Sequence, residues 1–286
     1  MLHSTNTSKI IPPLPLYEGI SAIADAGFPA IDLTLSYHDY VLADDYKQTA
    51  KKIVDVAAQH GAIINQVHAP FSGKDTYETN LVPLMPRMLE FAGLLGAKVA
   101  VIHPIHGWRY SYYKNEMLEK NLEFYSSLAK YAKDSGVKIG LENMWMRRPV
   151  SNYIEDSLYA DPFELAGAYD DLSDPEAFTV CLDLGHVAIC GREPVDAIKI
   201  IGNRIGALHV HDVDYVNDSH TLPGQGKLEW DEICRALAEI NYSGDFTLEP
   251  DGFTARYPKE LIPSALRMMS DVAAYYAEKI ESYKTK

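Results

Sequence analysis

The stretch DSGVKIGLEN, residues 134–143, contains the pattern that decides the fold of this 286-residue chain. A helical segment is expected to end at Gly136, a short apolar run follows, and the run ends on the carboxylate of Glu142. Glycine after a helix favours a left-handed cap, and a short apolar run beyond such a cap is typical of a buried strand. The stretch therefore predicts a helix, a stop and a strand with a polar group at its end.

The same order of features recurs along the chain. Amphipathic helical stretches are expected to end at six glycines, namely Gly27, Gly61, Gly96, Gly136, Gly202 and Gly244. Strand-like apolar runs follow them at residues 29–35, 62–67, 97–102, 137–142, 204–210 and 245–249. The interval of 66 residues between Gly136 and Gly202 fits two units, with a helix near 163–172 and a strand near 177–184. A further strand near 2–7 brings the expected number to eight.

Strands that alternate with helices at this pitch predict parallel βα units, and eight units predict a closed (β/α)8 TIM barrel. We expect a single domain over residues 1–286, with a closing helix over Lys259–Lys286. The competing fold is a doubly wound open sheet. Neither GxGxxG nor GxxxxGK[ST] follows any of the expected strands, which weakens that alternative.

The composition excludes several classes of protein. No apolar run approaches the roughly 20 residues needed to span a bilayer, and the first residues lack the order of a signal peptide. We therefore expect a cytoplasmic protein without membrane contact, and the sequence leaves open whether it forms homo-oligomers. The net charge of −14 disfavours binding to nucleic-acid backbones. The three cysteines lack CxxC spacing and are expected to be buried free thiols.

Polar side chains occur where the expected strands end. The residues at these places are His68, His103, His106, Glu142, Asp183, His186, His209, His211 and Glu249. Seven of the ten histidines, counting His220, lie at or just after a strand end. In a TIM barrel these ends meet at one mouth, where the chemistry of the fold takes place. The sequence therefore predicts one site, built from several strand ends.

The ligand types in this site favour a divalent metal. Imidazole and carboxylate without thiolate suit manganese, zinc or cobalt better than magnesium. An unpaired carboxylate at a barrel mouth would carry a heavy desolvation cost, which a cation would remove. We expect Glu142, Asp183, His209 and Glu249 to have functional roles in this site. For His106 and His211, a ligand role and a purely structural role remain equally open.

Seven short motifs carry a resemblance to a known family. They are HAPF, HPIHG, LENMW, DLGH, HVHD, DSHTLPGQG and TLEPDG, in this order and over nearly the whole chain. The chain resembles the xylose isomerase-like barrel superfamily, which includes sugar phosphate isomerases and epimerases as well as endonuclease IV. The resemblance is specific for the superfamily and much less specific for one reaction.

The epimerase branch, similar to D-tagatose epimerase, implies one divalent metal held by residues that match Glu142, Asp183, His209 and Glu249. It also implies that a histidine matching His186 contacts the substrate. The endonuclease IV branch implies three zinc ions, and its additional ligands would match His68, His103, Asp218 and His220. We expect one bound divalent metal ion, and the matching residues would suffice for up to three. The epimerases' basic substrate residue has no counterpart in the segment DVDYVND, residues 212–218.

The resemblance and the two strand-end glutamates predict an enzyme of carbohydrate metabolism. We expect an isomerase or epimerase of a small sugar, sugar phosphate or polyol, in which Glu142 and Glu249 move a proton next to a carbonyl through a metal-stabilised enediolate. The alternatives are a phosphodiesterase acting on abasic DNA, a dehydratase of the same superfamily, and a non-catalytic binding barrel. The acidic and aromatic loops make nucleic acid an unexpected partner.

Aromatic and basic residues just after strand ends are further candidates for substrate contacts. Trp108 and Trp145 follow strand ends, where an aromatic face could cover the apolar side of a sugar ring, and Tyr112 has a similar position. Arg147, together with Arg148, could pair with a substrate phosphate or carboxylate. For each aromatic residue, ordinary packing of a loop is the favoured reading, whereas for the two arginines a solvated loop pair and a substrate contact are equally open.

Overall fold

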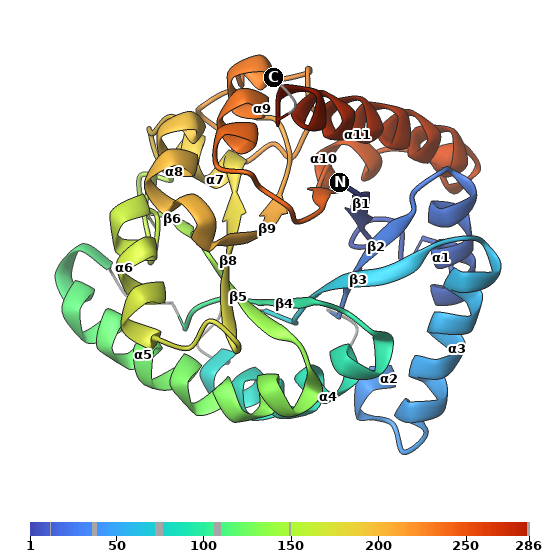
Figure 1. Ribbon diagram of the computed structural model, residues 1–286, viewed down its shortest axis with the longest axis horizontal. Helices are drawn as coiled ribbons and strands as arrows, with labels where there is room; N and C mark the ends of the chain where they lie inside the picture. Colours follow the sequence, from blue (N-terminus) through green and yellow to red (C-terminus); the bar gives the residue numbers. More distant parts are fainter. Residues whose placement is uncertain (12, 36–38, 72–76, 106–109, 149, 285–286) are drawn as a thin grey trace.

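The computed structural model describes residues 1–11, 13–35, 39–71, 77–105, 110–148 and 150–284. Within these residues, eight parallel strands form one sheet in the order β10-β1-β2-β3-β4-β5-β8-β9. A parallel bridge between Val210 and Leu248 joins the two ends of that order, so the sheet closes on itself. Helices surround the strands (Figure 1). The predicted single (β/α)8 TIM barrel is therefore confirmed.

The barrel strands form where the apolar runs predict them. They are β1 (His3–Asn6), β2 (Ala30–Thr34), β3 (Ile63–His68), β4 (Val99–Ile102), β5 (Lys138–Glu142), β8 (Phe178–Asp183), β9 (Ile205–His209) and β10 (Phe246–Leu248). Each falls within a predicted run, except that β3 continues one residue further, to His68. Parallel strands of this kind are buried on both faces, which is why their sequences read as nearly continuous apolar runs.

The long helices lie outside the strands. They are α1 (Leu16–Asp25), α3 (Tyr46–Gln59), α4 (Met85–Leu95), α5 (Tyr110–Ser135), α6 (Pro162–Leu172), α8 (Pro194–Ile201), α9 (Trp230–Glu239) and α11 (Ile262–Lys284). Short helices α2 (Asp39–Leu42), α7 (Leu184–Ile189) and α10 (Asp251–Thr254) follow strands β2, β8 and β10. The closing helix α11 begins three residues later than predicted, because Lys259–Leu261 form a 3-10 turn.

Five of the six predicted glycine stops have a positive φ, at Gly27, Gly61, Gly96, Gly136 and Gly202. The prediction for Gly244 is wrong. After α9 it is Asn241 that takes the left-handed conformation, with φ of 54°. A Cβ at Gly244 would lie 2.4 Å from Tyr242 Oη and 2.5 Å from Gly206 O. This glycine is needed for a close approach before β10, not for a helix cap.

A hairpin of two short strands was also not predicted. Strands β6 (Trp145–Arg147) and β7 (Ile154–Asp156) form an antiparallel hairpin just beyond the end of β5. Of the cysteines, all free, Cys181 and Cys234 are buried as expected, whereas Cys190 is only partly buried. None of the described helices combines the length and the apolar character needed to cross a membrane.

The core has two parts. The larger part includes the apolar side chains between the strands and the surrounding helices. A small separate cluster, Val99, Val101, Cys181 and Ala207, comes from alternate positions of β4, β8 and β9. These side chains point away from the helices, so they fill the barrel interior. The interior is packed, and the two ends of the barrel are therefore separate environments.

Candidate active site and metal centre

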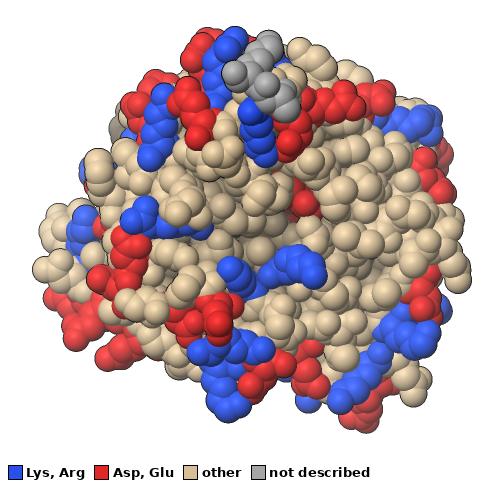
Figure 2. All heavy atoms as spheres, in the orientation of Figure 1, with Lys and Arg blue, Asp and Glu red and all other residues tan. Residues whose placement is uncertain are grey.

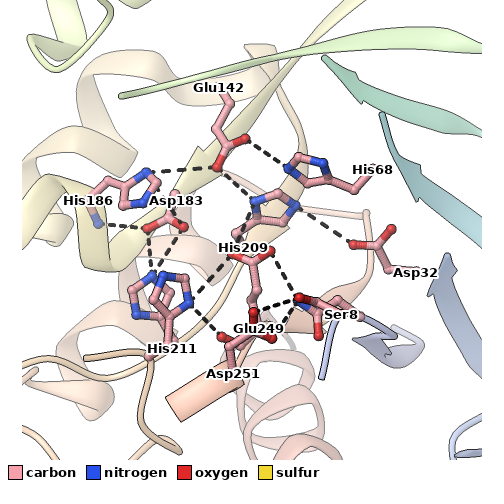
Figure 3. A network of polar contacts seen from close by, with 12 residues as sticks. Ser8, Asp32, His68, Glu142, Asp183, His186, His209, His211, Glu249 and Asp251 are labelled. Atoms are coloured by element: carbon pink, nitrogen blue, oxygen red, sulfur yellow. Dashed lines mark hydrogen bonds and ion pairs between the residues drawn. The ribbon is translucent and has the colours of Figure 1, made fainter. Parts of the chain in front are cut away.

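Polar residues from the strand ends converge at the carboxyl-terminal mouth of the barrel. His68, Glu142, Asp183 and His209 are the last residues of β3, β5, β8 and β9. His103 directly follows β4 and Glu249 directly follows β10. Figure 3 shows the side chains of the labelled residues pointing toward one another. A pocket of about 250 Å³ opens here, and seven of the nine predicted ligand positions line it: His68, His103, Glu142, His186, Asp218, His220 and Glu249.

Glu142 lies at the centre of the histidines. Its Oε1 is 2.9 Å from His209 Nδ1, and its Oε2 is 3.0 Å from His103 Nε2 and 3.6 Å from His68 Nε2. Burial by itself would raise the pKa of Glu142, but His209 and His103 outweigh burial and hold this pKa well below its usual range. Glu142 is therefore an ionised carboxylate in a buried position.

Asp183 has both a structural role and a place in the site. As the N-cap of α7, its Oδ1 accepts a hydrogen bond from His186 N at 2.7 Å. The same carboxylate contacts His211 Nε2 at 3.1 Å. Burial would raise its pKa, but His186 and His211 lower it below the usual value. Asn143 fixes the backbone here by bonding both Asp183 N and Asp183 O.

Glu249 is held in place by a residue of β1, the strand that pairs with β10. Asn6 Nδ2 donates to Glu249 Oε1 at 3.1 Å and to Asp251 Oδ1 at 3.3 Å. Glu249 Oε2 lies 3.7 Å from His209 Nδ1. Burial would raise the pKa of Glu249, but His209 and His220 bring it below the usual value. Ser8 donates to Asp251 Oδ2 at 2.8 Å, so the loop after β10 is fixed against the end of β1.

The loop that follows β9 brings two more predicted residues into the site. His220 Nε2 lies 3.1 Å from Asp218 Oδ2, and His220 Nδ1 donates to Glu249 O at 2.8 Å. The ring of His220 stacks on His211 with 3.8 Å between centroids and 8° between planes. His211, whose role the sequence leaves open, is therefore a buried member of the site. A Cβ at Gly185 would lie 2.0 Å from His211 Cε1, so the start of α7 must remain close to this ring.

The buried side chain of Asp212 fixes the conformation of the loop that follows β9. Its carboxylate accepts hydrogen bonds from Val213 N, Gly224 N, Leu228 N and Trp230 Nε1 at 2.8 to 3.1 Å. Because each of these donors comes from a different point of the loop, one buried side chain fixes the path of the whole segment.

Sequence reasoning missed several residues of the site. Asp32 lies in β2, fully buried, with Oδ2 at 3.8 Å from His209 Nε2 and 3.1 Å from Gln66 Nε2. The signal was available, since an ionisable residue inside the apolar run AIDLT demands a partner. Asn6, Ser8, Asp212 and Asp251 were also missed, and their polar character alone does not distinguish them from ordinary loop residues.

The structure places the candidate substrate-contact residues in different surroundings. Trp145 lines the pocket and lies edge-on to His186, with 6.3 Å between ring centroids. Arg147 is not among the described residues that line the pocket. Its guanidinium lies over the Trp145 ring and donates to Asn152 O, while Arg148 pairs with Glu155. His106 and Trp108 lie outside the described residues.

Several groups of side chains in this mouth could hold a metal ion. In each group the ligand atoms lie within 4.8 Å of one another, and the groups are His68-Glu142-His209, Glu142-Asp183-His186, Asp183-His211-Glu249 and His186-His211-Asp218-His220. Asp218 Oδ1 is buried and accepts no hydrogen bond from the described residues. Such a carboxylate oxygen is the kind of ligand that a divalent cation requires.

Known proteins match this chain over most of its length. An uncharacterized protein of Methanocaldococcus jannaschii is 28% identical over 287 residues, which cover 96% of this chain and 92% of that protein. A D-psicose 3-epimerase of Enterocloster bolteae is 24% identical over 240 residues, covering 80% and 74%.

A solved structure has a similar fold. The crystal structure of D-psicose 3-epimerase with D-tagatose from Clostridium cellulolyticum H10 covers 96% of this chain and 99% of that chain, with a TM-score of 0.75 and 19% identity. The family model described as xylose isomerase-like TIM barrel matches residues 20–272. The chain therefore belongs to the xylose isomerase-like TIM barrel family.

Proposed function

We propose that the protein is a divalent-metal-dependent isomerase or epimerase of a small sugar, sugar phosphate or polyol. One observation carries this proposal. His209 Nδ1 lies 2.9 Å from Glu142 Oε1 and 3.7 Å from Glu249 Oε2. The two carboxylates come from β5 and from the end of β10, which are not neighbours in the barrel. Two carboxylates that approach one point from different walls are what a proton-transfer reaction requires.

Glu142, Asp183, His209 and Glu249 are the residues that we propose as metal ligands. The two nitrogens of His209 support this assignment, because Nδ1 faces Glu142 and Glu249 while Nε2 lies toward the buried carboxylate of Asp32. A carboxylate behind a histidine is the usual partner of a metal-ligating imidazole. The mixture of oxygen and nitrogen ligands favours manganese, zinc or cobalt over magnesium. A cation held there supplies Lewis acidity toward the carbonyl and hydroxyl oxygens of a substrate.

In this proposal, Glu142 and Glu249 transfer the proton. Glu142 is buried and Glu249 is partly buried, and both have pKa values held below the usual range, so each is ionised and able to accept a proton at neutral pH. Asn6 fixes the direction of the Glu249 carboxylate. Phe71, Met144 and Trp145 line the same pocket and would cover the C–H face of a sugar.

The test uses glutamine variants in heavy water. Glu142→Gln and Glu249→Gln keep the shape and one ligand oxygen but remove the basic carboxylate, so turnover should fall by a factor of at least about 100 while metal remains bound. The parent enzyme should place deuterium on the carbon next to the carbonyl of a ketose. Glu260→Gln, at an exposed position in the turn before α11, is the matched control and should behave as the parent.

Two results would count against the proposal. Sugar turnover without deuterium uptake would indicate a hydride shift, and full activity of both glutamine variants would remove the two carboxylates from the chemistry. A dehydratase of the same family would reveal itself by a product that is lighter by one water in mass spectrometry.

A second candidate function is cleavage of abasic DNA, as in endonuclease IV. The observation that favours it is the group His186-His211-Asp218-His220, which lies beside Glu142-Asp183-His186 and shares His186 with it. The site therefore has ligands for more than one ion. Metal analysis distinguishes the two functions, since one tightly held ion favours isomerisation and three favour phosphodiester cleavage. An abasic oligonucleotide assayed with zinc is the direct test.

A further inference from the structure

A second pocket lies at the opposite end of the barrel, where the strands begin. Its volume is about 520 Å³. Asn65, Lys98, Lys138 and Thr179, which line it, belong to β3, β5 and β8 or directly precede β4. Figure 2 shows the molecule from this end, with a hollow near the centre of the face and basic side chains beside it. The pocket is therefore distinct from the carboxyl-terminal mouth that holds Glu142.

Lysines from two neighbouring parts of the sheet line this pocket. Lys138 N donates to Lys98 O at 2.9 Å, so the backbones of the two residues are hydrogen-bonded neighbours, and both residues line the pocket. Among the described residues, neither ammonium group has a carboxylate within 4.0 Å, whereas the nearby Lys133 pairs with Asp174 at 2.6 Å. The chain has 40 acidic and 26 basic residues. Two lysines without a counter-ion therefore give this pocket a positive potential within an acidic chain.

The acidic residues of the pocket do not neutralise these lysines. Asp245 is buried, and its Oδ2 accepts a hydrogen bond from Asn65 Nδ2 at 2.6 Å. Burial raises the pKa of Asp245, which reduces the tendency of this carboxyl group to be charged. Glu176 is exposed at the rim. Ser243, also exposed, adds a hydroxyl group that can donate to an anion.

The barrel interior separates this pocket from the proposed active site. The cluster of Val99, Val101, Cys181 and Ala207 fills the space between the two ends. A molecule bound near Lys98 and Lys138 therefore does not reach the metal ligands, and the two sites can be tested independently.

We propose that the pocket at the amino-terminal end of the barrel binds a small oxyanion with two or more negative charges. A phosphate group or a polycarboxylate has this chemistry. Lys98 and Lys138 would each neutralise one charge, and Ser243 would donate a hydrogen bond. A monovalent anion would leave one ammonium group uncompensated, so the pair favours the higher charge. This inference does not depend on the reaction proposed for the other mouth.

The test is a calorimetric titration of the full-length, metal-loaded protein with inorganic phosphate and, separately, with citrate. Ionic strength is kept constant with sodium chloride, because screening alone changes the heats of weak, non-specific binding. The double variant Lys98→Ala/Lys138→Ala removes both ammonium groups. Lys259→Ala is the matched control, since Lys259 is exposed near the start of α11 and has no ion pair among the described residues.

We expect saturable binding of at least one anion to the parent and to the Lys259 variant, and binding weaker by about tenfold or more in the double variant. Saturation by phosphate alone would assign a phosphate group, and saturation by citrate alone a polycarboxylate. Binding at the metal centre would be equally strong in the double variant, and this result would overturn the proposal. An absence of saturation by both anions at constant ionic strength would overturn it too.

Discussion

His209 and Asp32 face each other beneath the candidate site, with 3.8 Å between Nε2 and Oδ2, and both side chains are fully buried. Burial raises the pKa of Asp32 to about 6, and the neighbouring His209 opposes this effect. Asp32 is therefore mostly ionised at neutral pH and attracts the Nε2 side of the ring. The opposite nitrogen, Nδ1, is thereby directed toward Glu142.

Asp32→Asn should weaken metal binding although it removes no proposed ligand. The amide keeps the shape but loses the charge that orients His209, and loss of such a supporting group lowers metal affinity by roughly 10 to 100-fold. Competition against a chelator measures the affinity. Asp271→Asn, on the exposed face of α11, is the control and should leave it unchanged. An unchanged affinity in the Asp32 variant would show that His209 does not need this partner.

Alanine at His209 and alanine at His211 should have different effects on metal content. His209→Ala removes an imidazole that faces Glu142 and Glu249, so the tightly bound ion should be lost. His211→Ala removes a ring that stacks on His220 and contacts Asp183, so a single ion held by the proposed ligands should remain. Metal analysis of the purified variants checks both. Equal loss in the two variants would favour a shared, multinuclear centre.

Metal binding should become weaker as the pH falls. Burial by itself lowers the pKa of a histidine. Cys181, Glu249 and Glu142 outweigh this effect at His209, and Asp218 outweighs it at His220, so both pKa values are held well above the ordinary one. A cation must displace these protons, so affinity should still increase with pH above about 6.5, the ordinary histidine pKa. Calorimetry in buffers of different ionisation enthalpy counts the protons released. Zero release at pH 7 would contradict this expectation.

Asn6→Ala should destabilise the protein and reduce turnover together. The variant loses the amide that donates to Glu249 and Asp251 and leaves two partly buried carboxylates beside each other, which should lower the free energy of unfolding by about 2 to 4 kcal/mol. Ser8→Ala removes only one bond to Asp251 and should cost about 1 kcal/mol. Denaturant unfolding gives both values. Equal stability of the two variants would show that the Glu249 contact contributes little.

Asp212→Asn should loosen the loop that carries Asp218 and His220. The amide keeps only one acceptor oxygen for four donors, so we expect a loss of about 2 to 4 kcal/mol in the free energy of unfolding and faster hydrogen exchange over residues 213–228. Asp271→Asn, on the exposed face of α11, should change stability by less than about 0.5 kcal/mol. Normal exchange in the Asp212 variant would show that the loop is held by other contacts.

The barrel strands could be predicted because each unit repeats the same local signal. A run such as that of β8 is apolar on both faces, and its length of six residues favours a buried strand over a helix. The hairpin of β6 and β7 escaped prediction because its strands have three residues each and are only partly buried, so no pattern develops. The prediction of a helix cap at Gly244 is wrong because glycine also occurs where close packing excludes a side chain.

The site could be predicted only in part, because the sequence does not show in which direction a side chain points. A strand-end position places Glu142 and His209 near the mouth, but it does not reveal where a ring points, so the role of His211 stayed open. Asp32 depends on Gln66 and His209, which lie 34 and 177 residues further along the chain. Such pairings follow from the closed sheet and not from any local pattern.

The pairing of β1 with β10 closes the barrel, so it determines when a newly made chain can complete the fold. Asn6 at the end of β1 contacts Glu249 just after β10, 243 residues later. A chain leaving the ribosome from its amino terminus has β1 paired with β2 on one side only, until residues 246–248 have emerged. Exposed strand edges invite pairing with other chains. Synthesis that stops before β10 should therefore give an aggregation-prone product, and the carboxylate of Glu249 joins the mouth only at the last stage.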